Sequence, residues 1–383
     1  MSYRDHLVDD VLAWWTTHGP DHEHGGVLTC WDNAGTRLVG EDKYTWSQGR
    51  WAWLTARVAL SAGLLGVDGG WYAEQAVRTA RFVRDHALLP DGTTAFVTDR
   101  SGAEAGPHTS VYADLFAALG FAGVARLRPE EDWGALGEDI LVRSAAAIEA
   151  ARFRSDPYPV PAGHRSFGLP MILVGVGEQV HRATGSAASA AIVREAARQI
   201  EEHHLHGDDV AEMPSETDGL LARHRTPGHV LEATWFLHHA RDLLAGSALG
   251  ERERLARIAA RALDLGWDDE HGGLLRYVDQ DGGVPAGART DDPYEALVVD
   301  TWDTKLWWPN AEALYATALL LPDRHEQLHD YVFATFPEGP GREWTQIRAR
   351  DGVPLEKTVA LPVKDPFHIA RSLLMLVEME GAG

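Results

Sequence analysis

The stretch Pro227-Gly228-His229-Val230-Leu231-Glu232-Ala233-Thr234-Trp235-Phe236 combines helix-forming residues with polar groups that are unusual on an apolar helix. Pro-Gly interrupts regular structure, so a helix is predicted to begin at about His229. The spacing of three then puts His229 and Glu232 on one face, with Trp235 one step further along. Because buried polar groups are costly without a purpose, we interpret this stretch as a proton-transfer site. The alternative is a structural histidine that its own helix neighbour satisfies.

Helical periodicity extends over the rest of the chain and predicts about twelve helices. Odd-numbered segments are amphipathic and charged, whereas even-numbered segments are more apolar and are expected to be buried on more faces. Alternating exposed and buried helices predict an (α/α)6 barrel, with six inner and six outer helices. No linker or change in composition divides the chain, so residues 1–383 are predicted to form a single domain. The predicted segments are 3–17, 46–65, 70–88, 109–125, 130–151, 167–183, 186–204, 228–244, 249–266, 304–321, 323–335 and 365–380.

An internal repeat supports this design. The sequence Asp21-His22-Glu23-His24-Gly25-Gly26-Val27-Leu28 recurs as Asp268-Asp269-Glu270-His271-Gly272-Gly273-Leu274-Leu275. Both copies predict β-hairpins before the second and tenth helices, and residues 93–98 and 343–350 are further candidates. We expect these hairpins to cover one mouth of the barrel. The equivalent histidines of the two copies are assigned structural roles, and the cluster at 203–206 is expected to be solvated.

Composition limits the possible partners and location. The chain has 383 residues, of which 45% are apolar and 24% charged, with a net charge of -22. Such an acidic chain is not expected to bind nucleic acid or an anionic membrane. The N-terminus is too charged for a signal peptide, and no run approaches the ~20 apolar residues of a membrane helix. Cys30 is the only cysteine, which fits a reducing cytoplasm and excludes an internal disulfide.

Polar and aromatic residues recur near the N-terminal ends of the even-numbered helices. If six inner helices enter from the same end, these groups converge at one mouth of the barrel, where they would form a site. Arg371 lies at the same end of its helix. The predicted catalytic residues are His229, His368, Arg50, Glu232 and Glu312. The predicted substrate-binding residues are Trp46, Gln48, Tyr112, Asp114, Met171, Trp235, Lys305 and Trp308.

Two histidines on opposed helices predict acid/base chemistry, because imidazole titrates near neutral pH. One imidazole removes a proton next to a carbonyl, and the other returns a proton to the opposite face, which inverts one stereocentre. Arg50 would stabilise the developing enolate charge, and Glu312 would bind hydroxyls or share in proton transfer. Glu232 is expected to orient His229. Trp46, Trp235 and Trp308 would provide apolar planes for a sugar.

Other chemistries fit these residues less well. A metal site at His229 and Glu232 lacks further ligands, so no metal is expected. Glycoside hydrolysis requires two opposed carboxylates, which Asp114 and Glu312 could supply, but it leaves the histidines without a role. The sequence contains no phosphate-binding P-loop and no nucleophile elbow.

Four motifs together resemble the N-acylglucosamine 2-epimerase family, whose animal members are also called renin-binding proteins. Its relatives include cellobiose 2-epimerases and isomerases that act on mannose or sulfoquinovose. The resemblance covers nearly the whole chain, and it implies an (α/α)6 barrel, often a homodimer, with His229, His368, Arg50 and Glu312 as central site residues. The motifs are Trp46-Ser47-Gln48-Gly49-Arg50, Pro227 through Phe236, Lys305-Leu306-Trp307-Trp308-Pro309-Asn310-Ala311-Glu312-Ala313 and Pro366-Phe367-His368.

One position separates the branches of this family. Cellobiose epimerases and the isomerases carry a further histidine after the methionine of the sixth helix, whereas Ile172 follows Met171 here. The resemblance therefore implies a 2-epimerase that interconverts N-acetylglucosamine and N-acetylmannosamine, or a close analogue of this pair. The alternatives are an aldose-ketose isomerase or 2-epimerase of free sugars, and a non-catalytic sugar- or protein-binding member. Some relatives are stimulated by ATP without consuming it, so ATP stays open as an activator although the sequence has no nucleotide motif.

Overall fold

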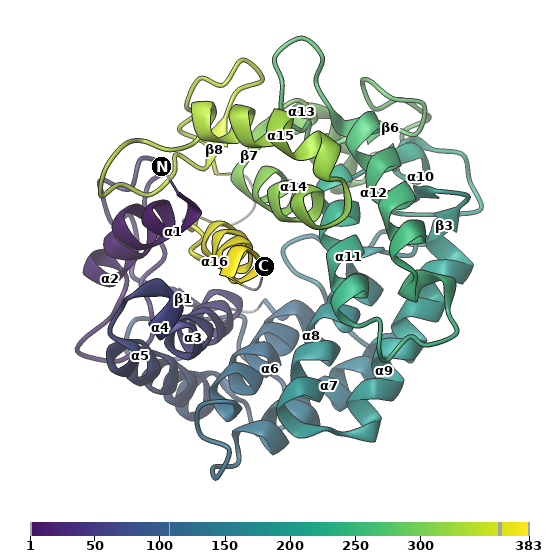
Figure 1. Cartoon of the computed structure of the whole chain (residues 1–383). Helices are drawn as coiled ribbons and strands as arrows, with labels where there is room; N and C mark the ends of the chain where they lie inside the picture. The colour runs from purple at the N-terminus through teal and green to yellow at the C-terminus, as the bar shows by residue number, and fades with distance from the viewer. Residues whose placement is uncertain (1, 107, 359–361, 382–383) are drawn as a thin grey trace.

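The computed structural model describes residues 2–106, 108–358 and 362–381. In this part of the chain, six inner helices form a closed ring in which each contacts the next and the last, α16, contacts the first, α3 (Figure 1). The predicted (α/α)6 barrel is therefore confirmed. The inner helices are α3 (Thr45–Leu60), α6 (Val111–Ala125), α8 (Gly168–Thr184), α11 (Pro227–His239), α14 (Trp307–Leu320) and α16 (Phe367–Gly381).

A second layer of helices packs outside this ring (Figure 1). Helix α12 shows why these helices lie outside, since its buried residues Leu255, Ile258, Ala259 and Ala262 follow the spacing of one helical face. The outer layer comprises α1 (Tyr3–Asp5), η1 (His6–Leu12), α2 (Ala13–His18), α5 (Gly69–Phe82), η2 (Val83–Ala87), α7 (Trp133–Glu149), α9 (Ala187–Gln199), η3 (Ile200–His204), α12 (Arg252–Gly266) and α15 (Pro322–Thr335). None of the helices in the described ranges is both long and apolar enough to cross a membrane.

Inner helices approach one another closely where small residues face each other. A Cβ atom added to Gly49 of α3 would lie 2.0 Å from the carbonyl oxygen of Phe116 in α6. Only glycine is compatible with this approach, because any side chain would overlap the neighbouring backbone. The contact explains the glycine of the Trp46–Arg50 motif, and it brings Arg50 against the Phe116 ring, with 4.1 Å between guanidinium carbon and ring centroid.

Several boundaries differ from the prediction. The expected helix 46–65 is interrupted at Ser61, where α3 gives way to α4 (Ala62–Leu65), and the expected helix 228–244 ends at His239. The prediction missed α13 (Pro293–Thr301), which begins with an Asp292 side chain that accepts a hydrogen bond from the backbone of Tyr294. Short turns of helix also occur at α10 (Leu220–Arg223) and η4 (Ala248–Gly250).

The predicted hairpins are only partly correct. Local bridges join Pro20 to Val27 and Trp267 to Leu274, as the repeat predicts. However, the strands that lead into inner helices pair with strands distant in sequence, because the inner helices enter from one end and their N-terminal segments lie side by side. These antiparallel pairs are β1 (Lys43–Tyr44) with β2 (Val97–Thr98), β5 (His224–Arg225) with β6 (Val278–Asp279), and β7 (Lys305–Leu306) with β8 (Ile347–Arg348). The remaining pair, β3 (Leu205–His206) with β4 (Asp209–Val210), is a local hairpin.

The first copy of the repeat builds a buried charge cluster. The Asp21 carboxylate accepts hydrogen bonds from backbone amides of its own turn and from Lys43 Nζ at 2.9 Å. It also pairs with Arg100 Nε at 3.0 Å, and Lys43 donates to the Gly25 carbonyl oxygen at 2.7 Å. One buried aspartate thus ties the turn to the strands that precede α3 and α6.

The second copy builds the same cluster with Asp268, Lys305 and Arg350. Asp268 pairs with Lys305 Nζ and with Arg350 Nε, both at 2.9 Å, and Lys305 donates to the Gly272 carbonyl oxygen at 2.6 Å. Burial lowers the pKa of Lys305 to about 8, although Asp268 opposes this shift. The prediction that Lys305 binds substrate is therefore wrong, because its ammonium group is used within the turn, and Lys43 is its structural counterpart.

Candidate active site

The N-terminal ends of the inner helices surround an open cavity. This confirms the predicted convergence at one mouth, because side chains from all six inner helices reach the cavity. The predicted residues that line it are Trp46, Arg50, Tyr112, Met171, His229, Glu232, Trp308 and His368. Trp308 lies between the two histidines, with ring centroids 5.0 Å from His229 and 5.9 Å from His368.

His229 is held by a carboxylate that the sequence analysis missed. Its Nδ1 lies 3.1 Å from both carboxylate oxygens of Glu212, which is buried. Burial disfavours the imidazolium, but the attraction and hydrogen bond of Glu212 outweigh it and raise the pKa of His229. With Nδ1 bound to Glu212, Nε2 is the nitrogen left for proton transfer. Glu232 does not bond His229, so the predicted orienting role of Glu232 is wrong.

Glu212 is itself held in place by the segment between α9 and α11. The amide of the neighbouring Ala211 donates a hydrogen bond to the His204 carbonyl oxygen at 2.8 Å. The Ala211 carbonyl oxygen in turn lies 2.9 Å from the ring Nδ1 of His204. The Glu212 carbonyl oxygen accepts from the Phe167 amide at 2.9 Å. His204 is therefore buried and structural, contrary to the expectation that the histidines at 203–206 are all solvated.

His368 has the same arrangement with a different carboxylate. Its Nδ1 lies 2.7 Å from Glu312 Oε1, and Glu312 is fully buried. Glu312 also accepts from Trp235 Nε1 at 2.8 Å. Neither Glu312 nor Trp235 lines the cavity, so the predicted contacts of these two residues with a sugar are wrong: Glu312 positions His368, and Trp235 positions Glu312.

Arg371 forms ion pairs with the two buried carboxylates next to His368, those of Glu232 and Glu312. One guanidinium nitrogen lies 2.5 Å from Glu232 Oε1 and 2.6 Å from Glu312 Oε1. Burial lowers the pKa of Arg371, but the two carboxylates outweigh this effect and raise it, so the guanidinium stays charged. The three buried charges satisfy one another, which fixes the carboxylate that orients His368.

Arg50 lines the cavity next to His368, and Asp365 lies close to both residues. Arg50 Nη1 lies 3.7 Å from Asp365 Oδ1, and the guanidinium stacks near Phe116 and Phe367. Asp365 accepts hydrogen bonds at 3.2 Å from the amides of Phe367 and His368, so its carboxylate caps α16. Its Oδ2 is also 3.8 Å from His368 Nε2. Arg50 is thus a cation that faces the cavity beside His368.

Two further predicted residues serve the fold instead of the cavity. Gln48 exchanges hydrogen bonds with both backbone groups of Val27, at 2.8 Å each, and so fastens the first repeat to α3. Asp114 accepts from the amide and hydroxyl of Thr94 at 2.6 and 2.8 Å. Burial raises the pKa of Asp114 to about 6, with Thr94 opposing the shift. The prediction that Gln48 and Asp114 contact the substrate is therefore wrong. Asp114 also cannot form the carboxylate pair of a glycosidase with Glu312.

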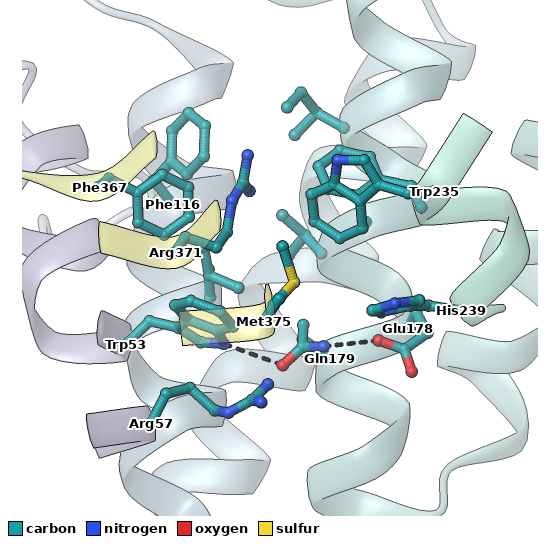
Figure 2. A pocket seen from close by; sticks show the side chains of 15 residues that line it. Trp53, Arg57, Phe116, Glu178, Gln179, Trp235, His239, Phe367, Arg371 and Met375 are labelled. Carbon is teal, nitrogen blue, oxygen red and sulfur yellow. Dashed lines mark hydrogen bonds between the residues drawn. The ribbon is translucent and has the colours of Figure 1, made fainter. Parts of the chain in front are cut away.

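A second, narrow cavity lies deeper along the inner helices (Figure 2). Its polar side chains bond to one another: Trp53 Nε1 donates to Gln179 Oε1 at 2.9 Å, and Gln179 donates to Glu178 at 2.6 Å. Burial lowers the pKa of His239 in its wall to about 3. This imidazole therefore stays neutral near pH 7, and we assign no catalysis to the second cavity.

The possibility of a metal site can be tested against the donor set. Ligand atoms of Glu232, Glu312 and His368 lie within 4.8 Å of one another. The guanidinium of Arg371 bonds to both carboxylates, and its nitrogen is 3.3 Å from His368 Nδ1. A cation at this position would have to displace Arg371, so the residues do not fit a metal ion.

Comparison with known proteins was consistent with this geometry. The family model for N-acylglucosamine 2-epimerase matches residues 178–370. Human N-acylglucosamine 2-epimerase is 29% identical over 98% of this chain and 88% of its own length, and the bovine enzyme is 28% identical over 97% and 89%. Cellobiose 2-epimerase from Bacillus thermoamylovorans, at 16% identity, shares the fold with a TM-score of 0.80 over 98% of each chain. A D-mannose isomerase, at 15% identity, has a TM-score of 0.78 over 98% of this chain and 97% of its own.

Proposed function

The chain belongs to the N-acylglucosamine 2-epimerase family and is a carbohydrate epimerase, and we propose that it interconverts N-acetylglucosamine and N-acetylmannosamine. The observation that carries this proposal is the pair of imidazoles, His229 and His368, which line one cavity and each bind a buried carboxylate through Nδ1. Two independently oriented bases around one ligand are what inversion of a stereocentre requires.

The chemistry proceeds on the open-chain sugar, whose C1 aldehyde acidifies the proton on C2. One imidazole takes this proton through Nε2, and the electron pair moves to the carbonyl oxygen to give an enolate. The opposite imidazole then donates a proton to the other face of C2, and the carbonyl re-forms with the C2 configuration inverted. Arg50 faces the cavity and stabilises the enolate oxygen in both directions. Trp308, between the imidazoles, supports the sugar from one side.

A panel of free sugars in deuterated solvent tests the substrate. We expect N-acetylmannosamine and N-acetylglucosamine to interconvert with incorporation of deuterium at C2, as followed by NMR. Good turnover of mannose or glucose without turnover of the N-acetylated pair would refute the substrate assignment. Binding of a sugar without any deuterium incorporation would instead indicate a non-catalytic member.

An aldose-ketose isomerase is the second candidate, because it also removes the C2 proton of an open-chain sugar. On a sugar with a hydroxyl at C2 the intermediate is an enediolate, and the isomerase delivers the proton to C1. Ile172 favours the N-acylglucosamine branch, since its apolar side chain lines the cavity at the position where, according to the resemblance, both the cellobiose epimerases and the isomerases carry a third histidine. A ketose as the main product would establish the isomerase.

Three further properties are proposals. We expect a cytoplasmic protein, because its single cysteine, Cys30, is a buried free thiol. We also expect a homodimer, which size-exclusion chromatography with light scattering would test. ATP is proposed as an activator that does not enter the chemistry. Assays with and without ATP, together with measurement of released phosphate, would test this role.

A further inference from the structure

A small aromatic cluster forms one wall of the catalytic cavity, apart from the main core. Met213, Tyr277 and Tyr294 are buried in this cluster, and Leu297 packs against it. All four side chains also line the cavity. Met213 follows Glu212, the partner of His229, so this wall lies on the His229 side of the site.

Arg276 brings a positive charge into this apolar wall. Its side chain is buried with a 6% exposed fraction, and it lines the cavity. One of its nitrogens donates to Thr301 Oγ1 at 3.0 Å, and its guanidinium carbon lies 4.8 Å from the centroid of the Tyr277 ring. Among the residues that the structure describes, Arg276 forms no ion pair, and its Nε–H has no acceptor.

The lack of a carboxylate partner distinguishes Arg276 from Arg50, which also lines this cavity, and from the nearby Arg371. Arg371 binds two carboxylates and Arg50 has Asp365 as a neighbour. Within the described part of the chain, the Arg276 guanidinium has only the Thr301 hydroxyl and the Tyr277 ring as side-chain partners. A buried guanidinium without an acidic partner is unfavourable unless a ligand supplies an acceptor. The ligand group that fits must therefore combine a strong acceptor oxygen with an apolar part.

We propose that Arg276, Met213, Tyr277, Tyr294 and Leu297 form the subsite that recognises the N-acyl substituent of the sugar. The Arg276 guanidinium donates to the amide carbonyl oxygen, and the acyl methyl packs against the aromatic and aliphatic wall. This inference rests on the proposed function and deepens it, because it names the residues that distinguish an N-acylated sugar from one with a free hydroxyl at C2. A C2 hydroxyl is too short to reach both groups, and it would leave the guanidinium without an acceptor.

The test compares the variant Arg276→Met with the wild type on two ligands. Dissociation constants are measured by calorimetry for N-acetylmannosamine and for mannose, and kcat/KM is measured for every sugar that turns over. We expect affinity and kcat/KM for N-acetylmannosamine to fall about 10–150-fold, the range for a lost hydrogen bond to a charged group. Mannose should change less than about threefold. The exposed Arg289, in the same segment, provides the control variant Arg289→Met, which should leave both ligands unchanged.

Equal losses for both sugars, or no loss for either, would overturn the subsite. Loss of affinity for glucuronate without loss for N-acetylmannosamine would also overturn it, in favour of a site for anions. If Arg276→Met does not fold, Arg276→Lys allows the same comparison, since it keeps the charge but not the planar donors. A wild-type enzyme that converts only unsubstituted hexoses refutes the proposed function itself. The subsite fails alone if the wild type converts the N-acetylated pair while the variant shows no selective loss.

Discussion

Replacing Glu212 by glutamine removes the negative charge that orients His229 while the side chain keeps its size. Glu212 holds Nδ1 of His229 with both oxygens at 3.1 Å. A hydrogen bond to a charged group contributes about 1.5–3 kcal/mol net. Since about 1.4 kcal/mol corresponds to a factor of ten, we expect Glu212→Gln to lower kcat by roughly 10–150-fold. The loss has a second source, because a glutamine amide that donates to Nδ1 would leave the proton on Nε2, where the base must be free.

The same substitution should change the pH dependence in a defined direction. Burial lowers the pKa of His229, whereas Glu212 and, more weakly, Glu232 raise it, and Arg276 opposes them. In the wild type the pKa is therefore raised, and the rate of proton removal by His229 increases as pH rises through this value. Without the Glu212 charge the pKa should fall, so the low-pH limb of the kcat profile should move to lower pH.

The assay follows net epimerisation and C2 deuterium exchange from each epimer separately between about pH 5 and 9, a range that spans the titration of imidazole. Exchange from the epimer that His229 deprotonates should be reduced most. Glu216→Gln is the matched control, because Glu216 lies on the same segment but is exposed. An unchanged pH limb together with an unchanged rate in Glu212→Gln would refute the idea that Glu212 sets the protonation state of His229.

The helices were predictable because their periodicity is local. The buried stripe of α12 and the continuous apolar surface of α6 can be read from neighbouring residues alone. The alternation of the two kinds of helix was sufficient to predict the double ring. Helix α13 was missed, although its start carries a usable signal: Asp292 is a helix cap, and Pro293 is suited to the first turn.

Side-chain direction was much harder to predict than location. Gln48, Asp114 and Lys305 do lie near the mouth of the barrel, as expected, but their side chains bond to the turns and strands around it. A position near a helix N-terminus tells at which end of the barrel a residue lies. It does not tell whether the side chain points into the cavity or toward the surrounding turns and strands. For Lys305 the repeat held the necessary information, because Lys43 occupies the same place before α3 without belonging to any predicted site.

The carboxylates that loops place beside the histidines could not be predicted from helical spacing. Glu212 lies 17 residues before His229 in an irregular segment, so no helical face relates them. Asp365, two positions before the start of α16, was detectable in principle as the cap of that helix. Arg371 was noticed at the start of the last helix, but its pairing with Glu232 and Glu312 depends on three helices that only the closed ring brings together.

Three further predictions concern the bases, metals and the repeat. His229→Asn and His368→Asn should each abolish net epimerisation, while one epimer still exchanges its C2 proton; near-normal epimerisation by either variant would refute the two-base mechanism. Activity should not change with EDTA, since Arg371 bonds to the carboxylates that a cation would need, and loss of activity restored by a divalent metal would contradict this. Lys305→Met should lower the free energy of unfolding by about 3–5 kcal/mol, because it leaves a buried aspartate without its ammonium partner. Lys43→Met breaks the equivalent pair, so denaturant titrations should give similar losses for both variants. Should Lys305→Met instead remain as stable as the wild type but raise KM strongly, the ammonium group would have to reach the substrate, and the structural role assigned to it here would be wrong.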